Sequence, residues 1–207
     1  MLRKSVLTRL MRRAPDSPGD ALSHLEEGVR LTEQGVFAEA IVELKQAIRA
    51  DPNCAEAQLQ LGVALYKMGR RNEAIKAYLA AIELRSDLVS AYKNLGVAYD
   101  ELGHFRHALR VYTKAIVLAA NNPELRNDLG TAYFNIGSYL EATKAYQQAL
   151  KIDPNNVRAH FSLGLVYLDV DEKELALEKH VKLKELDENE FAFQLLDKIQ
   201  RQGRRAS

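Results

Sequence analysis

Residues 89–122 read VSAYKNLGVAYDELGHFRHALRVYTKAIVLAANN, and this stretch decides the fold. Apolar side chains recur in it at three- and four-residue steps, first from Ala91 to Leu102 and then from Ala108 to Ile116. This spacing is typical of one face of an α-helix. Gly103 separates the two runs, and glycine readily adopts the left-handed conformation that ends a helix. We therefore predict two helices joined by a tight turn, with tyrosines and alanines packed between them.

The same pattern recurs along the chain with a period of 34 residues. Three series share the period: glycines within the first helix, alanines twelve residues later, and glycines at the turn, where an aspartate takes the fifth place. Their members are Gly28, Gly62, Gly96, Gly130 and Gly164; Ala40, Ala74, Ala108, Ala142 and Ala176; and Gly35, Gly69, Gly103, Gly137 and Asp171. A glycine inside a helix costs about 1 kcal/mol relative to alanine. Its recurrence therefore indicates that a neighbouring helix approaches closely at each position.

These residues resemble the tetratricopeptide repeat (TPR) family, whose unit is a pair of antiparallel helices with a 34-residue period. The resemblance implies an all-α fold, an α-solenoid that winds as a right-handed superhelix of five helix-turn-helix repeats. We place the repeats at 21–54, 55–88, 89–122, 123–156 and 157–190. The sequence departs from the family pattern in lacking the early tryptophan and in keeping the closing proline only as Pro52 and Pro154.

The last repeat is followed by Phe191, Leu195 and Ile199, which lie at four-residue steps. A solenoid needs a terminal element that covers its last apolar face. We therefore predict a capping helix over 191–203 and a short polar tail over 204–207.

In this family the first helices of the repeats line a concave groove that holds other proteins. We expect that groove to bind a peptide or helical segment of a partner, because an apolar track runs beside a ladder of polar side chains. The candidate groove residues are Leu25, Val29, Leu59, Gln60, Val63, Tyr66, Lys93, Asn94, Val97, Asn127, Asp128, Thr131, Phe134, Phe161 and Leu165. The clamp with which some members hold a chaperone's terminal carboxylate is not expected, since Leu25 and Val29 stand where it needs lysine and asparagine.

Motifs for chemistry are missing from the sequence. It has no phosphate-binding loop, no nucleophile elbow and no zinc-protease motif. His104 and His107 could place two ligands on one helix face, but no third ligand accompanies them. We therefore expect no enzyme activity, no cofactor and no metal site.

Charge is unevenly distributed over the 207 residues, although the net charge is only +1. Residues 1–20 and 191–207 together carry nine basic and three acidic side chains, which leaves 20 basic and 25 acidic ones between them. The basic arm at 1–20 is either flexible or a short amphipathic helix. The first alternative to groove binding is self-assembly, in which the basic ends of one chain bind the acidic middle of another. The second is recruitment through the basic arm, either to an anionic membrane surface or to a mitochondrion.

Cellular location is indicated only indirectly. The single cysteine, Cys54, cannot form an internal disulfide, and no apolar stretch approaches the roughly 18 residues that span a bilayer. The small net charge gives no reason to expect nucleic-acid binding. We therefore expect a cytoplasmic protein whose partners are other proteins.

Overall fold

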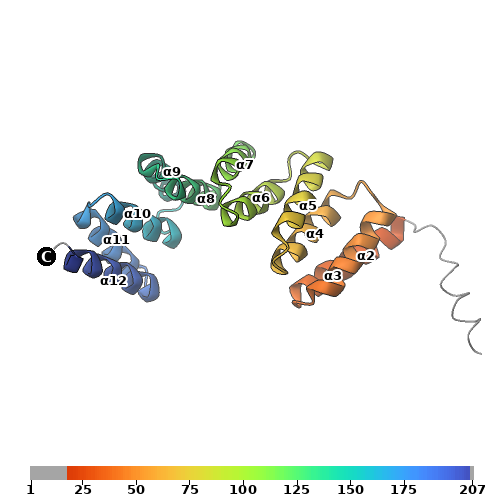
Figure 1. Ribbon diagram of the computed structural model, residues 1–207, viewed down its shortest axis with the longest axis horizontal. Helices are drawn as coiled ribbons and strands as arrows, with labels where there is room; N and C mark the ends of the chain where they lie inside the picture. The colour runs from red at the N-terminus through yellow and green to blue at the C-terminus, as the bar shows by residue number, and fades with distance from the viewer. Residues whose placement is uncertain (1–17, 206–207) are drawn as a thin grey trace, which may run out of the picture. The chain divides into compact units, whose positions relative to one another are not determined.

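The structure is a computed structural model that describes residues 18–205 (Figure 1). Most of the predicted basic arm at 1–20 and the end of the predicted tail lie outside the described residues. All regular secondary structure in the described range is helical. The helices are α2 (Pro18–Glu33), α3 (Phe37–Ala50), α4 (Ala55–Lys67), α5 (Arg71–Leu84), α6 (Val89–Glu101), α7 (Phe105–Leu118), α8 (Pro123–Asn135), α9 (Tyr139–Ile152), α10 (Val157–Asp169), α11 (Lys173–Glu185) and α12 (Asn189–Arg205).

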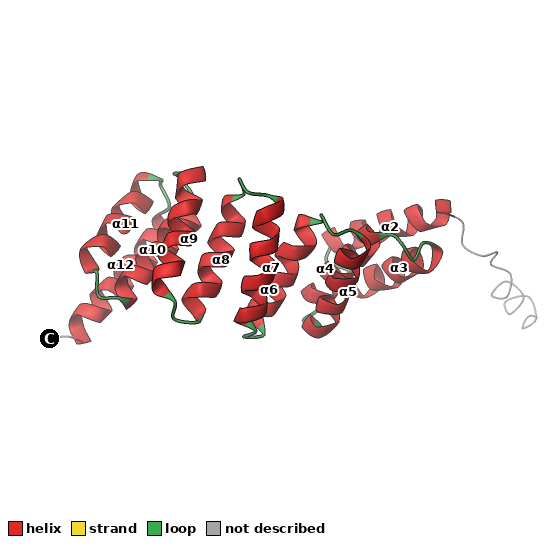
Figure 2. Cartoon of the chain, turned by 90° about the horizontal axis from the view of Figure 1, so that it is seen from above, coloured by secondary structure: helices red, strands yellow, loops and turns green. Residues whose placement is uncertain are grey.

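The chain forms two compact units, Met1–Ala98 and Tyr99–Ser207, and the boundary falls within α6. In the first unit α2 pairs with α3 and α4 pairs with α5, while in the second α8 pairs with α9 and α10 with α11. Figure 2 shows these pairs as successive antiparallel hairpins. The all-α prediction and the pairing of helices are therefore confirmed.

The turns within the hairpins adopt the left-handed conformation that the sequence predicted. Gly137 has φ 76° between α8 and α9, and Asp171 has φ 63° between α10 and α11. A non-glycine residue pays a penalty at positive φ, but aspartate is among the residues that tolerate it. The fifth hairpin can therefore keep the same turn without a glycine.

In the hairpins α2–α3, α4–α5 and α8–α9, a glycine of the first helix faces a large side chain of the second. A Cβ atom built on Gly130 of α8 would lie 2.6 Å from Cε1 of Tyr146 on α9, far inside normal contact distance. Tyr146 is 2% exposed, and Ala142 on the same helix is fully buried. The glycine therefore makes room for an aromatic ring, which explains why helix propensity is sacrificed at this position.

Helix α12 covers the end of the second unit. Its Leu195 is fully buried in one cluster with Leu168, Ala176, Leu183, Ala192 and Ile199. The branched end of Leu195 lies against Gly164, whose missing side chain leaves the space. The helix extends two residues beyond the predicted range of 191–203 at each end.

Candidate functional site

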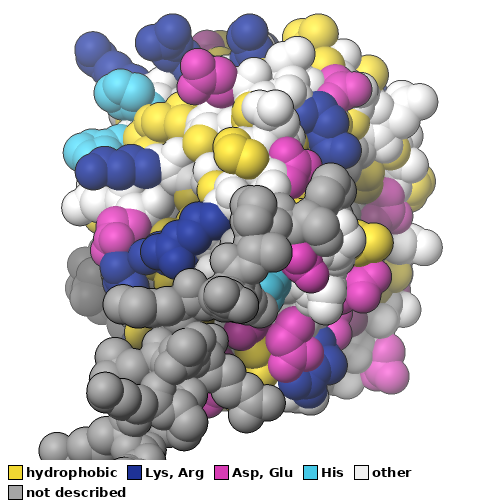
Figure 3. Space-filling model, turned by 90° about the vertical axis from the view of Figure 1, so that its right-hand side faces the viewer, with side chains coloured by type: hydrophobic (Ala, Val, Ile, Leu, Met, Phe, Trp, Pro, Cys, Tyr) yellow, Lys and Arg dark blue, Asp and Glu magenta, His cyan; other side chains and the backbone are white. Residues whose placement is uncertain are grey.

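The predicted groove residues of the first unit lie on α2, α4 and α6. Helix α2 contacts α4, so Leu25 and Val29 belong to the same layer of first helices as Val63 and Tyr66. These four side chains are partly exposed, whereas Leu59 is only 4% exposed and belongs to the core. On α6, Lys93, Asn94 and Val97 are also partly exposed. Figure 3 shows that apolar side chains reach the surface among charged ones on one face of the molecule.

Polar contacts orient the edge of this apolar surface. The Gln60 amide donates to Oε1 of Glu56 at 2.9 Å, and Oε2 of the same glutamate pairs with Arg85 at 3.1 Å. The Arg71 guanidinium lies 5.8 Å from the centre of the Tyr66 ring, within the range of a cation–π interaction. Gln60 and Tyr66 therefore have defined orientations before any partner binds.

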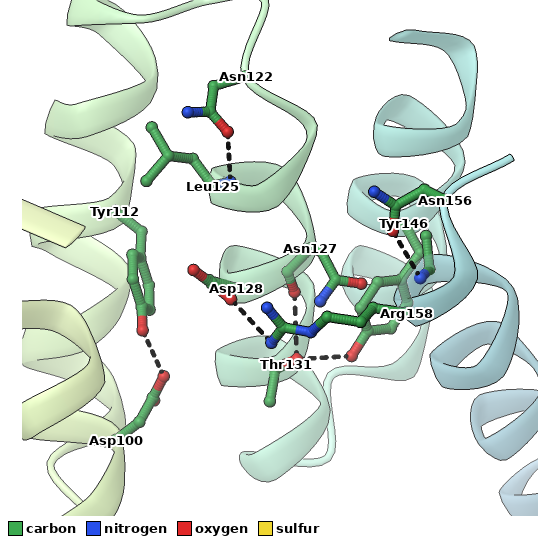
Figure 4. Close-up of polar contacts among 11 residues, drawn as sticks. Asp100, Tyr112, Asn122, Leu125, Asn127, Asp128, Thr131, Tyr146, Asn156 and Arg158 are labelled. Carbon is green, nitrogen blue, oxygen red and sulfur yellow. Dashed lines mark hydrogen bonds and ion pairs between the residues drawn. The ribbon is translucent and has the colours of Figure 1, made fainter. Parts of the chain in front are cut away.

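In the second unit the predicted groove residues lie on α8 and α10, which contact each other. Asparagine side chains fix where both helices begin. Oδ1 of Asn122 accepts from the backbone N–H of Leu125 at 3.2 Å, and Oδ1 of Asn156 accepts from that of Ala159 at 3.0 Å (Figure 4). Such caps satisfy amide groups that a helix leaves unpaired at its start.

Two of the predicted groove residues on α8 are buried rather than open. Asn127 is 1% exposed and Asp128 is 5% exposed. The Arg158 guanidinium reaches across from α10 and donates to Oδ1 of Asp128 at 3.1 Å (Figure 4). A partner would therefore meet the exposed Arg158 side chain before it reached these two residues.

Thr131 and Tyr146 continue the polar cluster along α8. The Tyr146 hydroxyl donates to Oγ1 of Thr131 at 3.2 Å, and Thr131 donates to the backbone oxygen of Asn127 at 3.1 Å. Burial raises the pKa of the Tyr146 hydroxyl. The hydroxyl therefore stays neutral near neutral pH.

Asp100, at the end of α6, is the most perturbed carboxylate of this surface. Its Oδ2 accepts from the Tyr112 hydroxyl of α7 at 2.9 Å, while Oδ1 is buried without a hydrogen bond. Burial raises the pKa of Asp100 to about 6, the Tyr112 hydrogen bond opposes that rise, and the charge of Asp128 adds to it. The raised pKa means that the ionised Asp100 side chain is less stable in the folded chain than it would be in water.

Tyr112 and Arg158 were absent from the predicted set, whereas Asp100 occupies the same repeat offset as the predicted Tyr66 and Phe134. The signal for Asp100 and Tyr112 is their twelve-residue spacing, which places them on the two helices of one repeat. Arg158 lies 30 residues after Asp128, four residues short of one repeat. It therefore lies on the first helix of the next repeat, about one helical turn before the position that corresponds to Asp128. Opposite charges at that spacing predict such a contact.

An open cavity of about 590 Å³ brings Phe134 of α8 together with Leu165 and Leu168 of α10. Asp169 of α10 also lines it, and α12 contributes Lys198, Arg201 and Gln202. The remaining predicted residue, Phe161, packs against Phe191 with ring centres 5.2 Å apart. Helix α12 thus covers part of the apolar surface that the sequence assigned to the groove.

Within residues 18–205, no group of three or more metal-binding side chains comes together. Over the same described range, no helix is long and apolar enough to cross a bilayer. The surface of the first helices combines partly exposed apolar side chains with ordered polar groups.

Paired helices with this repeat define the class of helical repeat proteins that bind other proteins. Comparison with family models identifies the family. The model described as TPR repeat matches residues 28–69, 66–103 and 132–170, and the one described as tetratricopeptide repeat matches residues 91–126. The chain belongs to the tetratricopeptide repeat family.

Solved structures of MamA are similar to this chain. One from Desulfovibrio magneticus RS-1 has 25% sequence identity and a TM-score of 0.77, with 82% of this chain and 96% of that chain covered. Two other MamA crystal structures have 29% and 27% identity with TM-scores of 0.73 and 0.70, cover 79% and 88% of this chain, and are themselves covered to 95% and 94%. No curated protein matches the chain in sequence.

Proposed function

We propose that the protein is a scaffold whose first helices bind a peptide or helical segment of a partner protein. The observation that carries this proposal is the row of partly exposed apolar side chains on the first helices of the first unit. Leu25 and Val29 provide it on α2, Val63 and Tyr66 on α4, and Val97 on α6. Exposed apolar surface that is ordered by neighbouring polar groups is typical of protein-binding sites.

Polar side chains beside this row supply the second requirement for peptide binding. Gln60, Lys93 and Asn94 are partly exposed on the same helices and can reach backbone groups of an extended segment. Lys93 adds a positive charge that suits an acidic residue in the partner. The membership of the chain in a protein-binding repeat family supports the same function.

The test is quantitative affinity purification with mass spectrometry from the cells that produce the protein. The double variant Val63→Glu with Val97→Glu places two charges in the apolar row and should abolish partner recovery. Val42→Glu with Val181→Glu is the matched control, because these valines are 55% and 53% exposed and lie on second helices. Equal recovery with the groove variant, at unchanged far-UV circular dichroism, would argue against the proposed surface.

Self-assembly and membrane recruitment stay predictions. Both depend in part on the basic arm at 1–20, most of which lies outside the described residues. Light scattering across a salt series tests the first, and co-sedimentation with liposomes, with and without residues 1–20, tests the second.

A further inference from the structure

The outer face of α7 carries only positive charge. The helix reads FRHALRVYTKAIVL and contains no aspartate or glutamate. Arg106, Arg110 and Lys114 are exposed and follow one another at four-residue steps, so they share one side of the helix. At 1.5 Å per residue this cationic stripe is about 12 Å long.

Helix α7 differs from the other second helices in the charge of its first turn. Helices α3, α5, α9 and α11 each carry glutamate in the first turn, where it suits the helix dipole: Glu39, Glu73, Glu141 and Glu174. In α7 the first turn holds Arg106 and His107 instead, which the dipole disfavours.

Within residues 18–205, the three cations of the stripe have no compensating ion-pair partner. Helix α8 packs against α7, and Asp128 of α8 pairs with Arg158 of α10. Like charges four residues apart destabilise a helix. Repulsion among Arg106, Arg110 and Lys114 therefore destabilises α7, and the packing of these exposed side chains does not require the charges.

We propose that this stripe binds an acidic segment of a protein partner, at a surface separate from the first-helix groove. Arginine pairs with carboxylates through two parallel hydrogen bonds, and two of the three cations are arginine. Val117 lies at the end of the stripe and is 79% exposed. An acidic segment that also carries an apolar side chain matches both features.

A protein partner fits this surface better than a membrane or a nucleic acid. Three cations on one helix give weak attraction to anionic lipid, and stable anchoring needs a second signal such as a lipid chain or a large apolar face. Single-stranded nucleic acid is normally held by aromatic side chains that stack on bases. Among the exposed side chains from Arg106 to Val117, the one aromatic ring is that of His107, and it already lies against the rings of Tyr99 and His104.

The test uses the full-length protein and three probes: a labelled poly-L-glutamate peptide, duplex DNA, and vesicles of phosphatidylcholine with phosphatidylserine. The stripe variant combines Arg106→Glu, Arg110→Glu and Lys114→Glu. The control variant combines Lys76→Glu, Lys144→Glu and Lys184→Glu, which are exposed and give the same change in total charge on three other helices. Affinities are measured by fluorescence anisotropy and co-sedimentation at low and high salt.

Poly-L-glutamate should bind the wild type in a salt-dependent manner, about tenfold more tightly than the stripe variant. The control variant should stay within about twofold of the wild type. An equal loss in both variants would show that total charge alone is responsible and would overturn the proposal. Stripe-dependent binding that is tighter for DNA or for vesicles than for poly-L-glutamate would also overturn it, by assigning another class of partner.

The single substitution Arg110→Glu separates binding from folding. It turns two repulsive four-residue pairs, with Arg106 and with Lys114, into attractive ones. Its melting temperature should therefore equal or exceed that of the wild type, while its affinity for poly-L-glutamate should fall severalfold. Full affinity in this variant, or a loss of affinity accompanied by a lower melting temperature, would contradict a binding role for the stripe.

Discussion

Replacing Asp100 with asparagine should stabilise the protein at neutral pH, because the buried charge is removed while the shape is kept. The pKa of Asp100 rises from its usual 3.8 to about 6 on folding. Folding therefore holds the proton more tightly than the unfolded chain does. This carboxyl favours the folded state at low pH and opposes it increasingly as pH rises from about 4 to about 6.

The magnitude follows from the size of the shift. Each pKa unit corresponds to about 1.4 kcal/mol, so the rise of roughly two units sets a ceiling of about 3 kcal/mol at pH 7. Asp100 is only partly buried, and water screens its charge. We therefore expect Asp100→Asn to raise the free energy of unfolding by about 1–2 kcal/mol at pH 7. The asparagine carbonyl can still accept the Tyr112 hydroxyl.

The assay is urea denaturation followed by far-UV circular dichroism at several pH values between 4 and 8. The stability difference between variant and wild type should be small at pH 4 and reach its full size above pH 6. Asp169→Asn is a matched control, since Asp169 also accepts a tyrosine hydroxyl, from Tyr139 at 3.3 Å, but is exposed. The control should change stability by less than about 0.5 kcal/mol. A variant Asp100→Asn that is no more stable than wild type at pH 7, or equally stabilised at pH 4, would refute the reasoning.

Two further predictions concern packing and pH. Gly130→Ala should destabilise the protein by about 1–3 kcal/mol despite its better helix propensity, because the new methyl meets the Tyr146 ring. In a Tyr146→Ala background the same change should stabilise by up to about 1 kcal/mol, and the same sign in both backgrounds in urea denaturation would contradict the steric explanation. His160 donates from Nε2 to the Pro154 oxygen at 2.9 Å, and burial lowers its pKa below 6.5, so its contribution to stability is present above that pH and is lost as pH falls. In His160→Gln the free energy of unfolding should fall less steeply as pH decreases below about 6.5. The same pH dependence in variant and wild type would show that His160 does not cause the loss of stability.

The repeat period was sufficient to predict the elements of the fold because it reflects direct contacts. Gly130 and Tyr146 occur at fixed offsets since one makes room for the other. Gly137 and Asp171 occur at one offset since both adopt a positive φ at the same turn. Residues at these positions are determined by contacts and turns within one hairpin. They can therefore be predicted from the sequence of a single repeat.

The candidate site was less predictable because it depends on contacts between repeats. An offset shows which face of a helix a residue occupies, but it does not show what the next helix places over that face. Asp128 is covered by Arg158, which comes from the following repeat. Phe161 is covered by Phe191, which comes from α12 outside the repeats. Asp128 is buried and Phe161 is half-buried because Arg158 and Phe191 cover them. Neither covering residue recurs with the 34-residue period, so the period could not predict the burial.

Deviation from the repeat therefore carries the information about partners. The offset of Asp100 is filled by Thr32, Tyr66, Phe134 and Leu168 in the other repeats, so the fold does not demand a carboxylate there. The first turn of α7 likewise lacks the glutamate found in its four counterparts. In both places the chain accepts an electrostatic cost that a neutral or acidic residue would avoid. Where the requirements of folding and the observed residue disagree in this way, function is the remaining reason for the choice. The two exceptions belong to neighbouring helices of the third repeat, α6 and α7.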